Sequence, residues 1–347
     1  MISEPYISVI IVSWNALETI QRCLPSVANT DHDSFEIVFV DNASQDESVS
    51  WVKEHFPAIR IVNHPENWAF CKGNNRAVPF ARGEVLVFLN NDVEVPTNWL
   101  SPIIDCFQND QTVAAAQPKL HQFVDRDQFE YAGAAGGFLD KNGYPFTRGR
   151  IFETLEKDSG QYDDDVELFW ASGTCLVIRK NLFLDTGGFE ESFFMHMEEI
   201  DLCWRLKRAG HRIVLIPKSI VFHMGGASLS SQSSQKHYLN FRNNLLMLYR
   251  NLPPSEWRVV LARRIVLDSL AILRALLVGQ FKAGFAIIRA YVSAFRMKAT
   301  HENIRPLKSQ PVAPLPYRGS IIWDYFIAGR KRFSDLDQGL FKPSDRQ

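Results

Sequence analysis

Three apolar segments of strand length constrain the fold of this chain more than any other feature. They are ISVIIV at 7–12, FEIVFV at 35–40 and EVLVFL at 84–89. Because successive residues are apolar, both faces of each strand should be buried, as in a parallel sheet covered by helices. Helix-length segments lie between and after them, at about 17–28, 47–55 and 73–81. The alternation predicts an α/β fold with a doubly wound, mainly parallel sheet.

Polar residues follow each of these three predicted strands. Ser13 and Asn15 follow the first strand, Asp41 the second, and Asn90 and Asp92 the third. Ligands of doubly wound sheets bind beyond the carboxyl ends of the strands, so we expect these side chains to share one edge. Turn formation or helix capping would explain any one group alone. Three such groups together favour a binding site.

The segment FFMHMEEIDLCWRL at 193–206 sets three carboxylates, Glu198, Glu199 and Asp201, among large apolar residues. A buried carboxylate must be paired, bound to metal or neutralised by a shifted pKa, so these residues are candidates for acid/base chemistry. The alternative is a helix N-terminus, where acidic side chains are stabilised by the helix dipole.

Composition and charge exclude several classes of protein. The 347 residues are 46% hydrophobic and carry a net charge of −1, which predicts a globular chain with no nucleic-acid partner. The five cysteines lack C-x-x-C spacing, so a reducing, cytoplasmic setting is expected. We find no secretion signal, and no apolar run of about 18 residues that would predict a membrane span.

Two regions lie outside this pattern. Residues 122–165 lack a clear period, which predicts an irregular insertion or a flexible loop over a site. Strands are expected again at 174–178 and 213–216, and helices from about His237 onward. The helical stretch 257–298 is apolar but rich in arginine and lysine, as in helices that lie on an anionic membrane. Packing on the catalytic domain or on a second subunit is the alternative.

Seven motifs now occur in order: ISVIIVSWN, VDNASQD, NWAFCKGNN, VFLNNDVEV, ASGTCLVIRK, GGFEESFFMHMEEIDLCWRLKRAG and VFHMGG. Together they resemble family 2 glycosyltransferases of the GT-A fold, close to the rhamnosyltransferase-like branch of bacterial surface polysaccharide synthesis. The resemblance implies a catalytic domain over 1–252. Residues 253–347 would form a C-terminal helical, membrane-associating region and tail.

The resemblance also implies a nucleoside-diphosphate sugar as donor. Asp41 matches the position that hydrogen-bonds the nucleotide base, and Ser13 and Asn15 would line the nucleoside. The Asn-rich turn of the family corresponds to Asn67, Lys72 and Asn74. There Lys72 could also meet the charge of the diphosphate.

A divalent cation, Mg²⁺ or Mn²⁺, is implied as cofactor. Asn90, Asn91 and Asp92 match the family's D-x-D element, although Asn90 replaces its first aspartate. A neutral carboxamide is a weak ligand, so Asp92 should carry most of the binding. His223 matches a late histidine that joins the metal ligands in related enzymes.

The family's E-D-x-D segment corresponds to Glu198, Glu199 and Asp201. Its second acid is usually the catalytic base, which implies Glu199 here, one methylene longer than the usual aspartate. Asp201 is the alternative base, and Glu198 would orient the site. The floor for sugar and acceptor would come from Trp170, Ser172 and Gly173, unless Trp170 is a core residue.

These expectations describe an inverting glycosyltransferase that uses dTDP-rhamnose or a UDP-hexose. Its acceptor would be a glycan or lipid-linked glycan at the inner face of the cytoplasmic membrane, where the protein would be peripheral. A nucleotidyltransferase is one alternative, although no Gly-rich basic loop follows the first strand. A non-catalytic nucleotide- or glycan-binding protein is the other.

Overall fold

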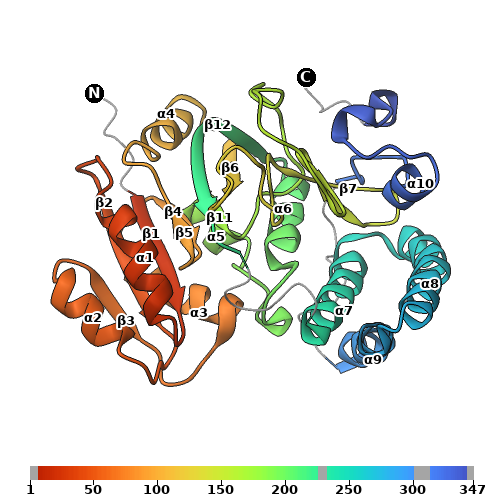
Figure 1. The fold of residues 1–347 in the computed structure, drawn as a ribbon, viewed down its shortest axis with the longest axis horizontal. Helices are drawn as coiled ribbons and strands as arrows, with labels where there is room; N and C mark the ends of the chain where they lie inside the picture. The colour runs from red at the N-terminus through yellow and green to blue at the C-terminus, as the bar shows by residue number, and fades with distance from the viewer. Residues whose placement is uncertain (1–6, 226–232, 301–312, 342–347) are drawn as a thin grey trace.

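The computed structural model describes residues 7–225, 233–300 and 313–341, and its centre is an eight-stranded sheet (Figure 1). The strand order is β3-β2-β1-β4-β11-β6-β12-β5. The bounds are β1 (Ile7–Ser13), β2 (Phe35–Asp41), β3 (Arg60–Asn63), β4 (Val85–Leu89), β5 (Val93–Glu94), β6 (Val113–Gln122), β11 (Cys175–Arg179) and β12 (Arg212–His223). β11 is antiparallel to β4 and β6, and β5 is antiparallel to β12, while the other pairs are parallel. The predicted α/β fold with a mainly parallel sheet is confirmed.

Helices cover both faces of this sheet, which explains why its strands are apolar throughout. Along β1, Ile7, Val9 and Ile11 enter one hydrophobic cluster and Ile10 enters the other. The first cluster contains residues of α1 (Leu17–Ala28), α2 (Ser48–His55) and α4 (Ser101–Asn109). The second contains residues of α3 (Ala69–Ala77), α5 (Lys180–Asp185), α6 (Glu198–Arg208) and α7 (Ser234–Asn251). Burial on both sides therefore fixes the register of the central strands.

Several element boundaries differ from the sequence prediction. The helix expected at 73–81 is α3, which ends at Ala77 and continues as a short 3-10 turn over Val78–Phe80. The strand expected at 213–216 is β12, which extends to His223. The fully internal strand β6 was not predicted at all. Its sequence VAAAQPKLHQ has few β-branched residues, and its burial between β11 and β12 compensates for that weak preference.

The expectation of an irregular insertion at 122–165 misses a small sheet within that region. It contains a second, antiparallel sheet of β7 (Gly137–Leu139), β8 (Pro145–Thr147), β9 (Arg150–Ile151) and β10 (Thr154–Leu155). The chain's late segment 313–341, including α10 (Ile321–Phe326), packs on this sheet. The ring centroids of Phe146 and Tyr317, for example, lie 5.5 Å apart. Strands of two or three residues joined by tight turns leave no long alternating pattern in the sequence, so this sheet is not predicted from it.

The C-terminal helices form a separate layer beside α6 (Figure 1). α9 (Phe281–Thr300) packs along α7 and against α8 (Pro254–Leu277). Leu248, Trp257 and Ala294 belong to the same hydrophobic cluster, so residues on both sides of position 252 share one core. The division of the chain at 252 stays a prediction. Within the described ranges, no helix combines the length and the apolar character needed to cross a membrane.

Candidate active site

A cavity of about 540 Å³ lies at the carboxyl ends of the central strands. The polar residues that follow the first and third predicted strands meet on its wall: Ser13, Asn15, Asn90, Asn91 and Asp92. Asn91 Nδ2 donates to Ser13 Oγ at 3.2 Å, which ties the loop after β4 to the end of β1. The structure therefore brings together side chains that the sequence placed at one sheet edge.

The loops after β1 and β2 are joined by hydrogen bonds. Asn15, in the left-handed region at φ 47°, accepts the Gln45 N–H at 2.7 Å through Oδ1 and donates its own N–H to Ser44 Oγ at 2.9 Å. The carboxylate of Asp41 accepts the Ser44 N–H at 3.1 Å and is buried behind the cavity wall. Its neighbour Asn42 lines the cavity instead. Asp41 thus stabilises the turn after β2, and this turn would contact the nucleotide base.

The Asn-rich turn places two of its three predicted residues on the cavity wall. Asn67 Oδ1 accepts the Ala69 N–H at 2.9 Å, and Asn74 Nδ2 donates to the Phe70 carbonyl at 3.0 Å. Lys72 does not line the cavity. Its Nζ lies 4.1 Å from the ring centre of Trp68, on a different face of α3. The expected contact between Lys72 and a diphosphate is therefore corrected.

Asp92 and His223, the two residues expected to bind a metal, lie next to each other. Val93 of β5 is opposite His223 of β12 in the sheet register, so the preceding Asp92 reaches the imidazole. His223 Nε2 lies 3.1 Å from Asp92 Oδ1, and its Nδ1 lies 3.2 Å from Glu130 Oε1. Burial lowers the pKa of His223, but the two carboxylates outweigh burial and raise it to about 10. The two carboxylates beside this imidazole ring favour a positively charged group at this position.

The donor set at this position fits a divalent cation that is held jointly with a substrate. Asp92 and His223 both line the cavity, and Asn90 lies beside them. Among the described residues, no group of three or more His, Cys, Asp or Glu side chains is arranged to hold a metal by itself. Mg²⁺ in particular is usually bound by one or two carboxylates, with the remaining ligands supplied by substrate phosphates and water.

The opposite wall carries the first two acids of α6. Glu198 and Glu199 line the cavity, and each has one carboxylate oxygen, Oε2, that is buried without a hydrogen-bond partner. Burial raises the pKa of Glu199 to about 7, against the lowering effect of backbone N–H groups at the helix start. Burial and the neighbouring charge of Glu199 raise the pKa of Glu198 well above its usual value. Glu199 therefore has one carboxylate oxygen without a partner, and its raised pKa suits proton uptake near neutral pH.

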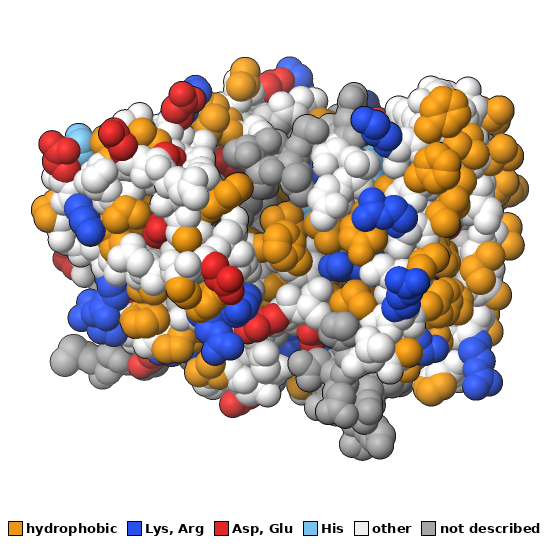
Figure 2. All heavy atoms as spheres, turned by 90° about the horizontal axis from the view of Figure 1, so that it is seen from below, with side chains coloured by type: hydrophobic (Ala, Val, Ile, Leu, Met, Phe, Trp, Pro, Cys, Tyr) orange, Lys and Arg blue, Asp and Glu red, His pale blue; other side chains and the backbone are white. Residues whose placement is uncertain are grey.

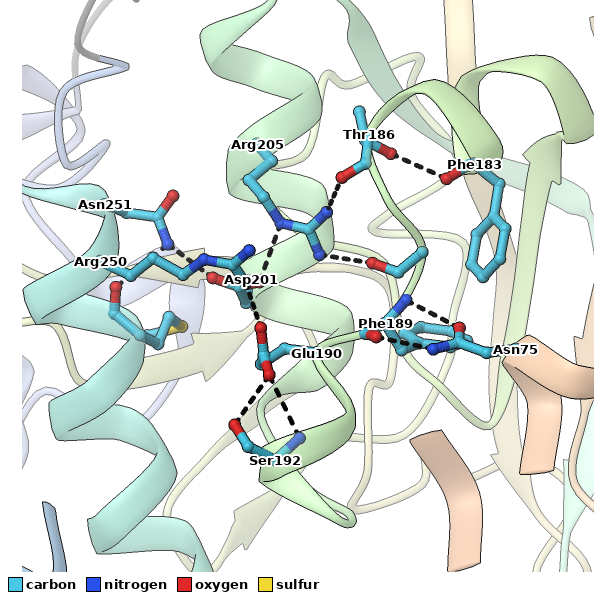
Figure 3. A network of polar contacts seen from close by, with 12 residues as sticks. Asn75, Phe183, Thr186, Phe189, Glu190, Ser192, Asp201, Arg205, Arg250 and Asn251 are labelled. Atoms are coloured by element: carbon cyan, nitrogen blue, oxygen red, sulfur yellow. Dashed lines mark hydrogen bonds and ion pairs between the residues drawn. The ribbon is translucent and has the colours of Figure 1, made fainter. Parts of the chain in front are cut away.

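Asp201 occupies a different environment from the other two acids (Figure 3). Its Oδ2 accepts from Arg205 Nε at 2.9 Å and from Arg250 Nη1 at 2.8 Å, and Asn251 Nδ2 donates to Oδ1 at 2.7 Å. Burial raises the pKa of Asp201, but Arg250 and Arg205 outweigh it, and the pKa is lowered. Asp201 does not line the cavity, so the expectation that it could take the proton is corrected. It joins α6 to α7.

The segment before α6 adds residues that the sequence did not point to. Phe194 and His196 line the cavity, and both have positive φ angles near 70°. A backbone of this kind is strained for residues with side chains and needs support from its surroundings. Asn243 of α7 gives that support, because its Nδ2 lies within hydrogen-bond distance of the carbonyls of Phe193, Met195 and His196. No sequence pattern near position 196 predicts this arrangement.

The predicted floor for sugar and acceptor is brought together only in part. Ser172 and Gly173 line the cavity, whereas Trp170 is a buried core residue whose Nε1 donates to the Phe138 carbonyl at 3.0 Å. The ring lies so close to Gly137 that a Cβ there would come within 1.9 Å of it. The core alternative for Trp170 is therefore the correct one.

Lys236 is a site residue that sequence reasoning missed. Within the described part of the chain, it is the sole lysine or arginine on the cavity wall. It lies in the first turn of α7, close enough to Glu130 for an electrostatic interaction, and burial lowers its pKa. Its one sequence cue is its position at the start of a helix that follows the late VFHMGG motif.

Solved structures with low sequence identity share this fold. GalNAc-T7 with UDP, GalNAc and Mn²⁺ aligns with a TM-score of 0.60 and 16% identity, over 92% of this chain and 60% of that one. The mannosyltransferase PcManGT from Pyrobaculum calidifontis, in complex with GDP-Man and Mn²⁺, aligns with a TM-score of 0.52 and 16% identity, over 85% and 88%. The fold of this chain is GT-A.

Three curated relatives are similar over 62–71% of the chain. The uncharacterized protein y4gI of Sinorhizobium fredii is 26% identical over 71% of this chain, and O-antigen biosynthesis protein RfbC of Myxococcus xanthus is 28% identical over 65%. This chain spans 27% and 18% of their respective lengths. The N-acetylglucosaminyl-diphospho-decaprenol L-rhamnosyltransferase of Mycobacterium tuberculosis is 25% identical over 62% of this chain and 75% of its own length.

The family comparison covers the half of the chain that contains the first strands, the Asn-rich turn and Asp92. Residues 8–186 match the family described as "Glycosyl transferase family 2". Since this match includes more than half of the residues, the chain belongs to glycosyl transferase family 2.

Proposed function

We propose that this protein is an inverting, metal-dependent glycosyltransferase that moves a sugar from a nucleoside diphosphate to a hydroxyl of a glycan acceptor. One observation carries the proposal: a single cavity is lined both by the Asp92–His223 pair and by Glu199, whose Oε2 is buried without a hydrogen-bond partner. The Asp92–His223 pair could bind a cation on the leaving diphosphate, and Glu199 could accept the proton of an attacking hydroxyl. Family membership and the GT-A fold support the same reaction class.

In the proposed reaction the acceptor oxygen forms a bond to the anomeric carbon from the side opposite the diphosphate. The bond between that carbon and the diphosphate oxygen breaks, and the nucleoside diphosphate leaves with the electron pair. Glu199 takes the hydroxyl proton. A general base works best when its pKa lies near the working pH, and the raised pKa of Glu199, about 7, meets this condition.

The remaining cavity residues have roles in holding the donor. Mg²⁺ or Mn²⁺ bound by Asp92 and His223, beside Asn90, would offset the charge that develops on the diphosphate. Lys236 takes the place first assigned to Lys72 as a cationic contact. The nucleoside would be held by the polar residues Ser13, Asn15, Asn67 and Asn74, and Asp41 would shape the turn beside it. Ser172 and Gly173 would contact the sugar or the acceptor, and Glu198 would orient them.

The donor and acceptor are proposed from similarity. The names of two relatives refer to rhamnosyl transfer onto a decaprenol-linked sugar and to O-antigen biosynthesis. We therefore favour dTDP-rhamnose or a UDP-hexose as donor, and a glycan or lipid-linked glycan of surface polysaccharide synthesis as acceptor. A lipid-linked acceptor would place the protein at the inner face of the cytoplasmic membrane, as a peripheral protein.

The proposal is tested by incubating the full chain with a panel of UDP-, dTDP- and GDP-sugars, with Mn²⁺ or Mg²⁺, and identifying the products. Release of a nucleoside diphosphate is expected. Glu199→Gln should lower the transfer rate by about 10²- to 10⁴-fold, the usual contribution of a general base, without changing donor affinity. Glu54→Gln, at an exposed position on α2, is the matched control.

Three outcomes would contradict the proposal in different ways. Release of pyrophosphate would identify a nucleotidyltransferase. Donor binding without turnover, unchanged in Glu199→Gln, would identify a non-catalytic binding protein. Full activity in Glu199→Gln would show that another group takes the proton.

A further inference from the structure

Helix α9 presents a continuous apolar stripe to the outside of the molecule. The stripe consists of Phe281, Phe285, Ile288, Val292 and Phe295, whose side chains are 44–62% exposed. Their alternating spacing of four and three residues places them along one side of the helix. Such a stripe normally faces a protein core, yet about half of the surface of these side chains is exposed.

The inward side of α9 consists mostly of small residues. Its buried residues are Gly284, Ala286, Ile287, Ala290 and Ala294, and α9 packs against α7 and α8. Mostly small residues inside and large apolar residues outside are the reverse of what a water-facing helix shows. The outer surface of α9 is therefore built for contact with something apolar.

Helix α8 has a second stripe of the same kind. Val259, Val266, Leu270, Leu273 and Leu277 are 51–77% exposed and recur at intervals of seven, four, three and four residues. α8 and α9 pack against each other. We call the exposed apolar and basic side chains of these two helices the α8–α9 face. Figure 2 shows apolar side chains gathered on this flank of the molecule, at the right of the view, with lysine and arginine side chains among them.

The exposed charges on α8 and α9 are positive with one exception. Exposed basic residues occur along both helices: Arg258, Arg263, Arg274, Lys282, Arg289 and Arg296. Every residue of these two helices is described, and Glu256 is the one exposed acid on them. The other acid, Asp268, is buried and pairs with Arg264 at 3.2 Å. The face thus combines apolar side chains with an uncompensated excess of positive charge.

The orientation of this face is fixed by buried polar contacts. Asp268 of α8 accepts from the hydroxyl of Tyr291 of α9 at 2.6 Å and also from the hydroxyl of Tyr144. Arg264 donates to Asn244 of α7. Because removing one partner of a buried charge pair is costly, these contacts keep α8 and α9 docked on the body while their outer sides stay exposed.

We propose that the α8–α9 face docks on the surface of an anionic membrane. Its apolar side chains would enter the boundary between headgroups and acyl chains, while the long basic side chains reach the lipid phosphates. A second copy of this chain fits less well, because a two-fold interface would bring the same basic residues together. The inference rests on the proposed function in one respect: a lipid-linked acceptor gives this contact its purpose.

The test is vesicle flotation of the full chain with phosphatidylcholine vesicles, with or without phosphatidylglycerol. Binding is expected with the anionic vesicles. The variant Arg263→Glu/Arg274→Glu/Lys282→Glu should bind at least about 100-fold more weakly, because each basic residue near an anionic surface contributes about fivefold. The matched control is Lys53→Glu/Arg60→Glu/Lys218→Glu, which changes exposed residues of other elements and should bind like the wild type.

A second variant tests the apolar part. Leu273→Ser/Phe285→Ser should lower vesicle binding while preserving the circular dichroism spectrum and the unfolding temperature, since both side chains are more than half exposed. Equal binding of all variants, or no preference for anionic lipid, would overturn the proposal. So would a dimer in sedimentation that Leu273→Ser/Phe285→Ser dissociates, with no binding to vesicles.

Failure of this inference and failure of the proposed function give different results. Vesicle binding needs no sugar donor. A chain that binds anionic vesicles but releases no nucleoside diphosphate would contradict the proposed function alone. A chain that transfers sugar to a soluble acceptor but ignores vesicles would contradict the membrane contact alone.

Discussion

His223 Nε2 lies 3.1 Å from Asp92 Oδ1, although the two residues come from opposite halves of the chain. The antiparallel pairing of β5 with β12 makes this contact, because it sets Val93 opposite His223. The carboxylate of Glu130 lies 3.2 Å from the other ring nitrogen, Nδ1. Metal-bound histidines commonly have such a carboxylate on the second nitrogen, which orients the ring and increases its basicity.

Glu130→Gln should therefore weaken divalent-metal binding without removing a ligand. Replacing the carboxylate that orients a metal-bound histidine typically lowers metal affinity by about 10- to 100-fold. The measurement is calorimetric titration of Mn²⁺ in the presence of UDP or dTDP. Asp92→Ala should have a larger effect, and Glu153→Gln, at an exposed position, should have none. Unchanged Mn²⁺ affinity in Asp92→Ala would remove this pair from the proposed metal site.

The two lysines near the cavity should respond differently to substitution. Lys236 lines the cavity, whereas Lys72 lies over the ring of Trp68 and 3.9 Å from the carboxylate of Glu66. Lys236→Ala should lower affinity for the nucleoside diphosphate by about tenfold or more, the loss expected for a charged hydrogen bond. Lys72→Ala should change it little. The reverse order of effects, measured by the same titration, would contradict the assignment.

Asp201→Asn should destabilise the fold rather than the chemistry. The substitution leaves Arg205 and Arg250 without their buried counter-charge, and breaking a buried ion pair in this way costs about 3–5 kcal/mol. Urea denaturation near neutral pH measures the loss, with Asp185→Asn as the exposed control. The donor affinity of the folded fraction should be unchanged.

The same variant has a pH dependence of known sign. The pKa of Asp201 is lowered in the folded chain, so its stabilising contribution is complete above the unfolded value of 3.8 and disappears as pH falls through the folded pKa. Wild type and Asp201→Asn should therefore converge in stability in strong acid. A constant difference across that range would show that Asp201 is not held as a paired carboxylate.

The sequence predicted the location of residues that directly follow a recognisable strand, because the strand end fixes their place at the sheet edge. β1, β2 and β4 are apolar enough to be recognised, and the residues after β1 and β4, such as Asn15 and Asp92, reach the cavity because strands end at one edge. The small antiparallel sheet and β6 could not be predicted from the sequence. Their strands are short or alanine-rich, and they form because they are buried between neighbouring elements.

The sequence was less informative where side-chain direction matters. Asp201 follows Glu199 by two positions, which places the two on different sides of α6. Its partner Arg250 lies on α7 and could not be inferred from local spacing. Lys72 and Trp170 likewise have suitable side chains that point elsewhere. Lys236 and His196 reach the cavity through the packing of α7 and through a strained backbone held by Asn243.

The pH dependence of transfer should report the ionisation of Glu199. Burial raises its pKa to about 7, and a general base must be ionised to act. With saturating donor and metal, the rate should rise about tenfold per pH unit below pH 7 and level off above it. An unperturbed glutamate, with a pKa near 4.5, would give a flat profile over the same range. A flat profile in the wild type would therefore argue against Glu199 as the base.

Stability should depend on the same group with the opposite sign. Because the pKa of Glu199 is raised on folding, the folded chain binds the proton more tightly, and its stability falls as pH rises from 4.5 towards 7. Glu199→Gln removes this buried charge. The variant should match the wild type in unfolding free energy at about pH 4 and exceed it at about pH 8, while remaining inactive at both. Equal stability at the higher pH would mean that water or another group already solvates the carboxylate, and its pKa would then be too low for the proposed role.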